Sequence, residues 1–336
     1  MEYKHYDSAN QTSINSSDDD CRGLHCYPDS VFTAVEAVTV ILALFGFLGN
    51  ALTVIAILTS SLRSNINSIL IGNLSFAIVL YCSLVLPLQA VAYHHRDWVL
   101  SASVCVVVAA IRIWLIGVNM SLLSAIAFYR FVHVVYPAAY PRWSEGKAFF
   151  VAIIFCWTFA LIFSVAPMLG WGSYRFESLI LQCTFNSDHA DKTHQVTVVT
   201  IGYVIPCVFI SVCYARIGCV VYKSRQRALR GSVYGRKKSQ RGSLRLTAMM
   251  LLIFVGFFVG TTPYFITNIA DPRRTRPLVH IWVPCAAWLL YCLNPVIYTV
   301  MDSNFLQAYK QLVCCLLCKE GDTTRHGSLR KSPSVR

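Results

Sequence analysis

Two arginines, Arg112 and Arg130, lie in one apolar stretch, residues 102–135, that is long enough to cross a lipid bilayer as a helix. A guanidinium group is costly at membrane depth, by about 2.5–3.5 kcal/mol on insertion scales, so each should face the protein interior. The two residues are about five helical turns apart and should share one face of the helix, with Asn119 close to it.

Arg112 has two interpretations. In the first, it pairs with Glu36, near the outer end of the first apolar stretch, or with backbone carbonyl groups. In the second, it is a bidentate anchor for the carboxylate or phosphate of a ligand. The chemistry expected here is anion binding. The apolar stretches contain no HExxH motif, nucleophile elbow or paired carboxylates, which disfavours an enzyme.

The elements that must position these arginines are membrane helices. The chain has 336 residues, of which 56% are hydrophobic and 13% charged, whereas a soluble globular protein is about a quarter charged. We predict an all-α membrane protein with a seven-transmembrane helix bundle and a short amphipathic eighth helix at about 303–314. The apolar runs are 31–59, 66–92, 102–135, 147–169, 195–223, 243–270 and 277–300.

Lysine and arginine gather at 223–245 and after residue 310. Positive loops stay in the cytosol, so the N-terminus should be outside. Sequons at Asn10 and Asn15 support an extracellular, glycosylated tail over 1–30, ahead of a seven-helix domain at 31–300 and a cytoplasmic tail with the eighth helix at 301–336. We see no cleavable signal peptide. The basic loop is short and tethered to the membrane, which disfavours a nucleic-acid partner.

Three sets of cysteines have expected roles. Cys105 and Cys183 should both face the oxidising outer space, so we expect a disulfide between them. Cys21 and Cys26 form a second candidate pair, whose connectivity the sequence leaves open. Three cysteines at the inner membrane face are candidates for palmitoylation, the alternative being inert thiols: Cys314, Cys315 and Cys318.

One landmark residue or more occurs in six of the seven runs, in a fixed order. Together they resemble a rhodopsin-like (class A) G-protein-coupled receptor over about residues 31–318. The landmarks are Asn50, Cys105, Arg130, Trp157, Pro167, Pro206, Tyr214, Phe257, Pro263, Asn294, Pro295, Tyr298 and Phe305. The segments "NLSFAIVLYCSLVLPLQA", "LQCTF" and "NIADPRRTRPLVHIWV" are also similar to a smaller group that includes the insect Moody and Trapped-in-endoderm receptors, melatonin receptors and the medium-chain fatty-acid receptor.

The resemblance implies a plasma-membrane receptor that activates a heterotrimeric G protein, with arrestin and membrane lipids as further partners and no cofactor or metal. Ligand binding would move the sixth helix at Pro263 and free Arg130. The implied coupling and switch residues are Arg130, Tyr214, Phe257, Pro263, Asn294, Pro295 and Tyr298. A transporter is the rival from another class, but the chain shows no internal repeats.

Four positions depart from the family pattern. Ile78 replaces a sodium-binding aspartate, and Tyr129 replaces the acid before Arg130. Ser243 lies near where a second acid can stand, and Thr261 replaces the toggle tryptophan. Two hypotheses follow beside ordinary ligand-dependent signalling. The receptor has raised basal activity because the inactive state lacks its salt bridge, or it is an atypical seven-helix protein that couples poorly.

The ligand end also departs from familiar receptors. Arg112 stands where amine receptors carry an aspartate, and Trp288 where opsins carry the retinal lysine, so both ligand classes are disfavoured. We predict an amphipathic acidic ligand such as a fatty acid or lysophospholipid, with the basic loop 271–277 either attracting it or simply solvated. The expected contacts beside Arg112 are Ile116, Met120, Tyr264, Phe265 and Trp288, with Gln89, His194, Asn268 and His280 as polar candidates; the alternative is ordinary packing.

Overall fold

The computed structural model describes residues 24–138, 147–186, 192–230 and 237–326. Seven helical spans in this part are long and apolar enough to cross a membrane, and their bounds agree closely with the predicted runs. They are α1 (Asp29–Thr59), α2 with α3 (Ile66–Leu80 and Leu86–His95), α4 (Ala102–Val135), α6 (Lys147–Val165), α7 with α8 (Lys192–Val199 and Ile205–Arg230), α9 (Lys237–Ala270) and α10 (Pro277–Met301).

Two of these spans contain a wider helical turn. Residues Tyr81–Val85 join α2 to α3, and residues Thr200–Val204 join α7 to α8, each as a π-helical segment. Such segments are frequent at functional sites because they re-aim side chains within a continuous helix. We call the second one the α7–α8 π turn.

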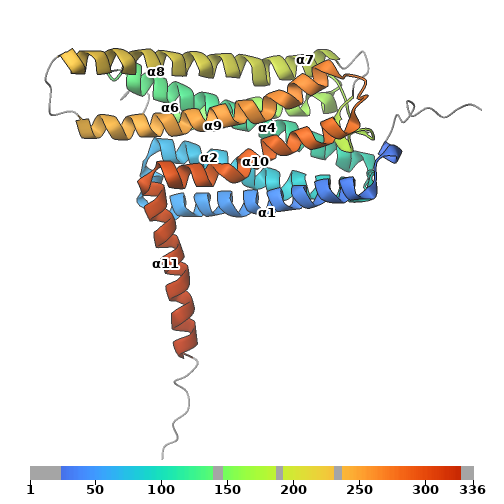
Figure 1. Cartoon of the computed structure of the whole chain (residues 1–336), viewed down its shortest axis with the longest axis horizontal. Coiled ribbons are helices and arrows are strands. Elements are labelled where there is room, and N and C mark those ends of the chain that lie inside the picture. Colours follow the sequence, from blue (N-terminus) through green and yellow to red (C-terminus); the bar gives the residue numbers. More distant parts are fainter. Residues whose placement is uncertain (1–23, 139–146, 187–191, 231–236, 327–336) are drawn as a thin grey trace, which may run out of the picture.

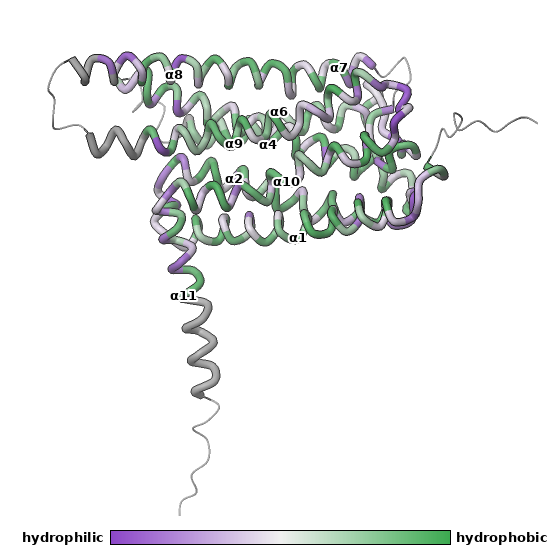
Figure 2. Tube along the Cα trace, viewed as in Figure 1, coloured by the Kyte–Doolittle hydropathy of each residue, from purple (hydrophilic) through white to green (hydrophobic). Residues whose placement is uncertain are grey.

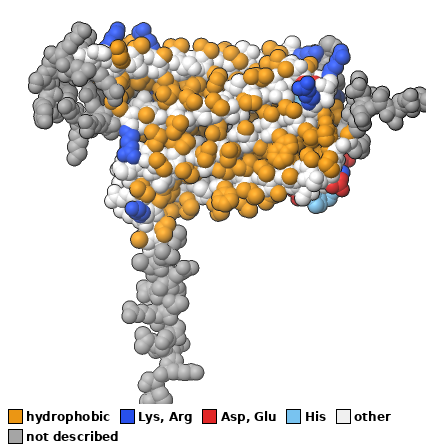
Figure 3. Space-filling view, viewed as in Figure 1, with side chains coloured by type: hydrophobic (Ala, Val, Ile, Leu, Met, Phe, Trp, Pro, Cys, Tyr) orange, Lys and Arg blue, Asp and Glu red, His pale blue; other side chains and the backbone are white. Residues whose placement is uncertain are grey.

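The helices lie side by side along one axis and form a single bundle (Figure 1). Hydrophobic residues predominate along the helices and hydrophilic ones towards their ends (Figure 2), and on the face shown in Figure 3 the Lys and Arg side chains gather towards the two ends. Isoleucine, leucine, valine and phenylalanine side chains remain exposed along most spans. An apolar belt between charged ends is what a bilayer requires, because hydrocarbon cannot solvate charge.

Helix α4 packs against α2, α6, α8 and α9 and is therefore central to the bundle. Arg112, Asn119 and Arg130 are each at most 5% exposed. The predicted interior face of this helix is thus confirmed.

A hairpin covers one end of the bundle, which we call the N-terminal end because α1 begins there. Strands β1 (Tyr174–Glu177) and β2 (Gln182–Phe185) pair antiparallel, with Phe176 opposite Cys183. The predicted disulfide between Cys105 and Cys183 is confirmed and fastens the hairpin to the start of α4.

Two elements differ from expectation. The eighth helix, α11 (Ser303–His326), is longer than the predicted 303–314, because no proline interrupts the chain before Pro333. It leaves the bundle at the end opposite the hairpin (Figure 1). Pro167 lies in a 3-10 turn after α6 and so ends that helix, whereas Pro263 and Pro295 lie inside α9 and α10.

Candidate functional site

A cavity of about 200 Å³ opens between the helices beneath the hairpin. Its walls come from α4, α7, α9, α10, the hairpin and the α7–α8 π turn, with Tyr81 and the loop residue Arg274. Six of the ten candidate ligand contacts line it: Arg112, Ile116, Tyr264, Phe265, Asn268 and Trp288. The expected switch residue Phe257 and the departing residue Thr261 line it as well.

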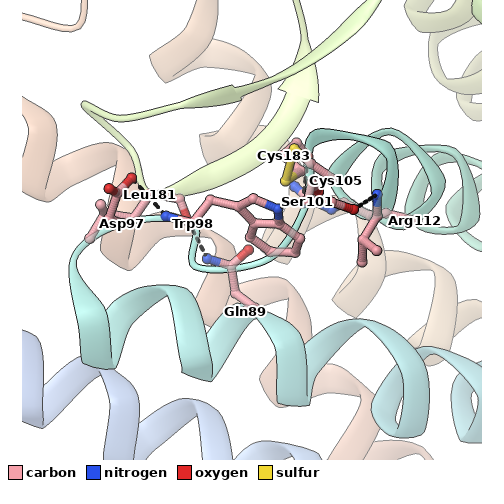
Figure 4. Close-up of a disulfide and its surroundings, with 9 residues drawn as sticks. Gln89, Asp97, Trp98, Ser101, Cys105, Arg112, Leu181 and Cys183 are labelled. Atoms are coloured by element: carbon pink, nitrogen blue, oxygen red, sulfur yellow. Dashed lines mark hydrogen bonds between the residues drawn. A yellow bond between two sulfur atoms is a disulfide. The ribbon is translucent and has the colours of Figure 1, made fainter.

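Arg112 is the only buried charge among the described residues of this cavity. Its Nη2 donates a hydrogen bond to the carbonyl oxygen of Cys183, at 2.6 Å (Figure 4). Its Nε–H has no hydrogen-bond partner among the described residues, although the side chain is 5% exposed. A buried donor without an acceptor is costly, and a ligand anion would satisfy it.

The alternative in which Arg112 pairs with Glu36 is wrong. The Glu36 carboxylate instead contacts Nδ1 of His94 at 3.1 Å, on a more exposed part of the bundle. Glu36 lies on α1 and His94 at the end of α3, which pack together, so the nearer base takes the acid. The carbonyl contact left open by the sequence is the one observed.

The hairpin carbonyl that holds Arg112 is itself fixed in place. The disulfide joins Cys183 to Cys105, and the Gln89 side chain donates to the carbonyl oxygen of Leu181 at 2.8 Å (Figure 4). Both ends of the contact are therefore anchored to helices. This arrangement holds the guanidinium group in one orientation.

Aromatic rings form most of the apolar wall. Trp288 donates its indole N–H to the hydroxyl of Tyr81 at 3.2 Å, and the rings of Tyr264 and Phe265 meet edge to face. Asn268 bonds back to the carbonyl oxygen of Tyr264 in its own helix. No Asp or Glu occurs among the described lining residues. The site is therefore apolar and aromatic with a positive end.

The other four candidate ligand contacts do not line the cavity. His194 is fully buried with its Nε2 at 3.0 Å from the carbonyl oxygen of Phe163. His280 lies 3.4 Å from the Asp271 carboxylate. Met120 is buried core, and the fourth, Gln89, bonds the hairpin as described above.

Sequence reasoning missed Tyr203, which lies in the α7–α8 π turn. Its hydroxyl is 2.9 Å from Thr262 Oγ1 and accepts a bond from Thr261 Oγ1, while its ring packs on Phe265 with 4.0 Å between centroids. Thr261, in place of the toggle tryptophan, thus leaves room for a tyrosine from the neighbouring span. The threonine was the available signal, but the π turn that aims Tyr203 cannot be read from periodicity.

Arg274 was also missed as a lining residue, although its basic loop was noted. It lines the cavity and pairs with Glu177 of the hairpin. Its loop is shaped by Asp271. Desolvation raises the pKa of the Asp271 carboxyl, but hydrogen bonds from the backbone N–H groups of Thr275 and Arg276 outweigh this and lower the pKa to about 2.

At the opposite end of the bundle, Arg130 is 2% exposed and donates from Nε to Thr247 Oγ1 on α9 at 3.1 Å. Arg245 of α9 donates to the carbonyl oxygen of Val300 on α10 at 2.8 Å. Tyr214 packs against Phe254 of α9, with ring centroids 6.3 Å apart. Helix α9 is thereby held against its neighbours around Arg130.

The predicted switch region lies between α1, α10 and α11. Asn50 donates to the carbonyl oxygen of Tyr291 at 2.8 Å and so joins α1 to α10. Asn294 is buried, and Tyr298 packs on Phe305 at 5.5 Å between centroids. Pro295 lies inside α10, where Gly49 of α1 leaves room for it: a Cβ added there would meet the ring at 3.0 Å.

Several predicted sites fall outside the described residues: Asn10, Asn15 and Cys21, and the side chains of Ser243, Cys315 and Cys318. Two further predicted sites belong to the described residues: Cys26 is disulfide-bonded, and Cys314 is exposed. No group of three or more His, Cys, Asp or Glu side chains in the described part of the chain could hold a metal ion.

A bundle of seven membrane-spanning helices with a covered cavity at one end and a buried arginine at the other defines a seven-transmembrane receptor. The chain belongs to the rhodopsin family of such receptors, whose family model, "7 transmembrane receptor (rhodopsin family)", matches residues 49–298. It is therefore a G-protein-coupled receptor and a multi-pass membrane protein, and the family comprises receptors rather than enzymes.

Individual relatives agree with this assignment. The chain is 27% identical to the G-protein coupled receptor Moody of Drosophila melanogaster, covering 86% of this chain and 52% of that protein. It is 26% identical to Trapped in endoderm-1 of the same fly, covering 86% and 80%. The chain thus spans about half the length of Moody. It is 23% identical to the melatonin receptor type 1C of Gallus gallus, covering 84% and 83%.

Squid rhodopsin shares the fold, with a TM-score of 0.76 at 20% identity over 92% of this chain and 94% of that one. This likeness concerns the fold alone.

Proposed function

We propose that this receptor binds an amphipathic, acidic small molecule at Arg112 and activates a heterotrimeric G protein. The unpartnered Nε–H of Arg112, buried in a cavity whose described walls carry no acid, is the observation on which this rests. The guanidinium group can bind a carboxylate or phosphate through parallel N–H groups, whereas a cationic ligand would meet a like charge.

The proposed location is the plasma membrane, with the tail 1–30, the hairpin and the cavity on the outside. The arginine- and lysine-rich segments 223–245 and 301–336 would then face the cytosol, in keeping with the charge rule for membrane proteins. Arg130 would lie at the G-protein side. Arrestin would join after phosphorylation of the basic loop or tail, and palmitate on Cys314, Cys315 and Cys318 would fix α11 to the membrane surface.

The ligand would act by population shift. In the structure α9 is tied to α4 by Arg130 and Thr247, and a ligand that binds more tightly to an arrangement with α9 displaced would favour release of Arg130. Pro263 lies inside α9, within the segment that lines the cavity and on the hairpin side of Thr247, and would supply the pivot.

The test is nucleotide exchange on a G-protein panel, with purified receptor and a set of fatty acids and lysophospholipids. Arg112→Ala should abolish the response, and Arg112→Lys should weaken it because the ammonium group is not bidentate. Arg96→Ala is the matched control, since this exposed arginine pairs with Asp29 away from the cavity. Equal activation of wild type and Arg112→Ala by an acidic ligand would reject the anchor.

A further inference from the structure

A second, smaller cavity of about 30 Å³ adjoins the ligand cavity. Its described lining comes from α4, α6 and the α7–α8 span: Ile113, Gly117, Ser121, Phe159, Ala160, Phe163, Val198 and Gly202. Four of these residues, Ile113, Gly117, Val198 and Gly202, line the larger cavity too. The two spaces therefore share one wall.

This shared wall is thin because two of its four residues are glycines. Gly202 has open space around it, since a Cβ added there would find no atom within 4 Å. At Gly117, α4 lies so close to α6 that a Cβ would be 3.0 Å from the Cβ of Ala160. Helices α4 and α6 are therefore in close contact at Gly117, whereas the wall between the two cavities is open at Gly202.

The small cavity lies at the depth expected for the hydrocarbon of a bilayer. Gly117 lies about midway along α4, so its depth is that of the hydrocarbon. The lining residues Gly117, Ser121, Phe159, Phe163 and Gly202 are all partly exposed at this level. Helix α4 packs closely with α6 and with α8, and the cavity lies in the cleft that these neighbours leave over α4.

We propose that the two cavities form one site for a single-chain membrane lipid. The anionic head group binds Arg112 beneath the hairpin, and the acyl chain passes Gly117 and Gly202 into the cleft between α4, α6 and the α7–α8 π turn, which opens to the bilayer. This rests on the proposed acidic ligand, and adds its chemical class and the side from which it arrives.

The two parts match in chemistry and spacing. The head-group end offers the unpartnered N–H of a buried arginine, and the cleft offers apolar walls with a single hydroxyl, that of Ser121. Gly117 and Ser121 follow Arg112 on α4 by about 7 and 14 Å of helix rise. A short acid would end within the larger cavity, whereas the chain of palmitic acid is long enough to continue into the cleft.

The test uses purified receptor in lipid nanodiscs and two photoreactive acids, palmitic and hexanoic, each with a diazirine at the methyl end. Cross-linked residues are located by mass spectrometry, and affinities are measured by displacement with the unlabelled acids. The palmitic probe should label the cleft at Ser121, Phe159 or Phe163, and the hexanoic probe the larger cavity. A lysophosphatidic acid with the same chain is run in parallel, and this pattern with either head group supports the proposal.

Gly202→Leu fills the gap without a clash and should weaken palmitic acid binding by about tenfold, and by clearly more than it weakens the binding of hexanoic acid, whose chain ends within the larger cavity. Gly218→Leu is the matched control, because Gly218 lies on the same span and also has no atom within 4 Å of an added Cβ. It should leave both affinities unchanged. Arg112→Ala should weaken both acids.

Unchanged palmitic acid binding in Gly202→Leu, or labelling confined to the larger cavity, would overturn the membrane route, while sensitivity to Arg112→Ala would still support the acidic ligand. Cleft labelling that persists in Arg112→Ala but is lost in Gly202→Leu would support the cleft as the acyl-chain site and would reject Arg112 as the head-group anchor. Absence of saturable binding by any of the acids would reject both.

Discussion

The hydroxyl of Thr247 on α9 accepts two hydrogen bonds from the buried guanidinium group of Arg130 on α4. Tyr129 takes the place of the acid that the family carries before this arginine, and the threonine supplies an acceptor in its stead. A neutral acceptor binds a guanidinium group more weakly than a carboxylate does. This one contact between α4 and α9 is therefore weaker than the salt bridge of the family pattern, in keeping with the hypothesis of raised basal activity.

Thr247→Val should raise basal nucleotide exchange. A hydrogen bond to a charged group contributes about 1.5–3 kcal/mol, and because Arg130 keeps other contacts we expect the lower value, about a tenfold shift towards the active arrangement. Exchange is measured on purified receptor without ligand. Thr158→Val is the control, since Thr158 is exposed and bonds only within its own helix. Equal basal rates in Thr247→Val and wild type would show that this contact does not restrain α9.

Thr247→Glu should have the opposite effect. A carboxylate beside Arg130 makes a charge-assisted bond, so the inactive arrangement gains free energy and basal exchange falls below wild type. Thr247→Gln separates charge from size, because it offers a neutral oxygen on a side chain of similar length. A fall in both variants alike would attribute the effect to size.

The spans were predictable from the sequence because a helix in lipid must be long and apolar, and both properties are local. The burial of Arg112 and Arg130 was predictable for the same reason, since a charged side chain at membrane depth is costly unless it faces the protein interior. The partners were not predictable. The choice of the Cys183 carbonyl over Glu36 depends on a hairpin whose position is set by tertiary contacts.

Two polar site residues missed from the sequence lie where the backbone departs from the regular helical period. Tyr203 is aimed at the cavity by a π turn, and Arg274 reaches it from a loop in which it adopts a left-handed φ of 53°. Neither conformation follows the regular period from which helix faces are read. Gly202 was missed for the same reason. Contacts on regular helices, such as Trp288 and Arg112, were found more readily, although Tyr291 on α10 was not among the predicted contacts.

Tyr203→Phe should destabilise this arrangement of the cavity. The variant keeps the ring on Phe265 but removes the hydroxyl that bonds Thr261 and Thr262, at a cost of about 1 kcal/mol. We expect a small fall in the Tm of detergent-purified receptor and a several-fold rise in basal exchange. Tyr222→Phe is the control, because Tyr222 is exposed and bonds only Gln226 of its own helix. If Tm and exchange match wild type, the hydroxyl contributes nothing to the coupling of α9.

Glu177→Gln should strengthen binding of an acidic ligand. The Glu177 carboxylate neutralises Arg274 at the rim of the cavity, and its removal leaves the guanidinium group to attract an anion. We expect faster association of hexanoic acid, with a gain that shrinks as ionic strength rises. Glu36→Gln removes an acid at the same end of the bundle that does not line the cavity. A similar gain in both variants would indicate a general field effect rather than release of Arg274.

Asp271→Ala should speed ligand dissociation, because the Asp271 carboxylate organises the loop that presents Arg274. With its pKa lowered from 3.8 to about 2, this carboxyl is ionised at neutral and mildly acidic pH. Its contribution is complete above the unfolded value and is lost only as the pH falls through the folded one. Lowering the pH from about 7 to about 6, where hexanoic acid remains ionised, should therefore leave its dissociation rate from the wild type unchanged, whereas its dissociation from Asp271→Ala should be faster at both pH values. A wild-type rate that rises over this interval would instead assign control of the loop to His280, which contacts the same carboxylate.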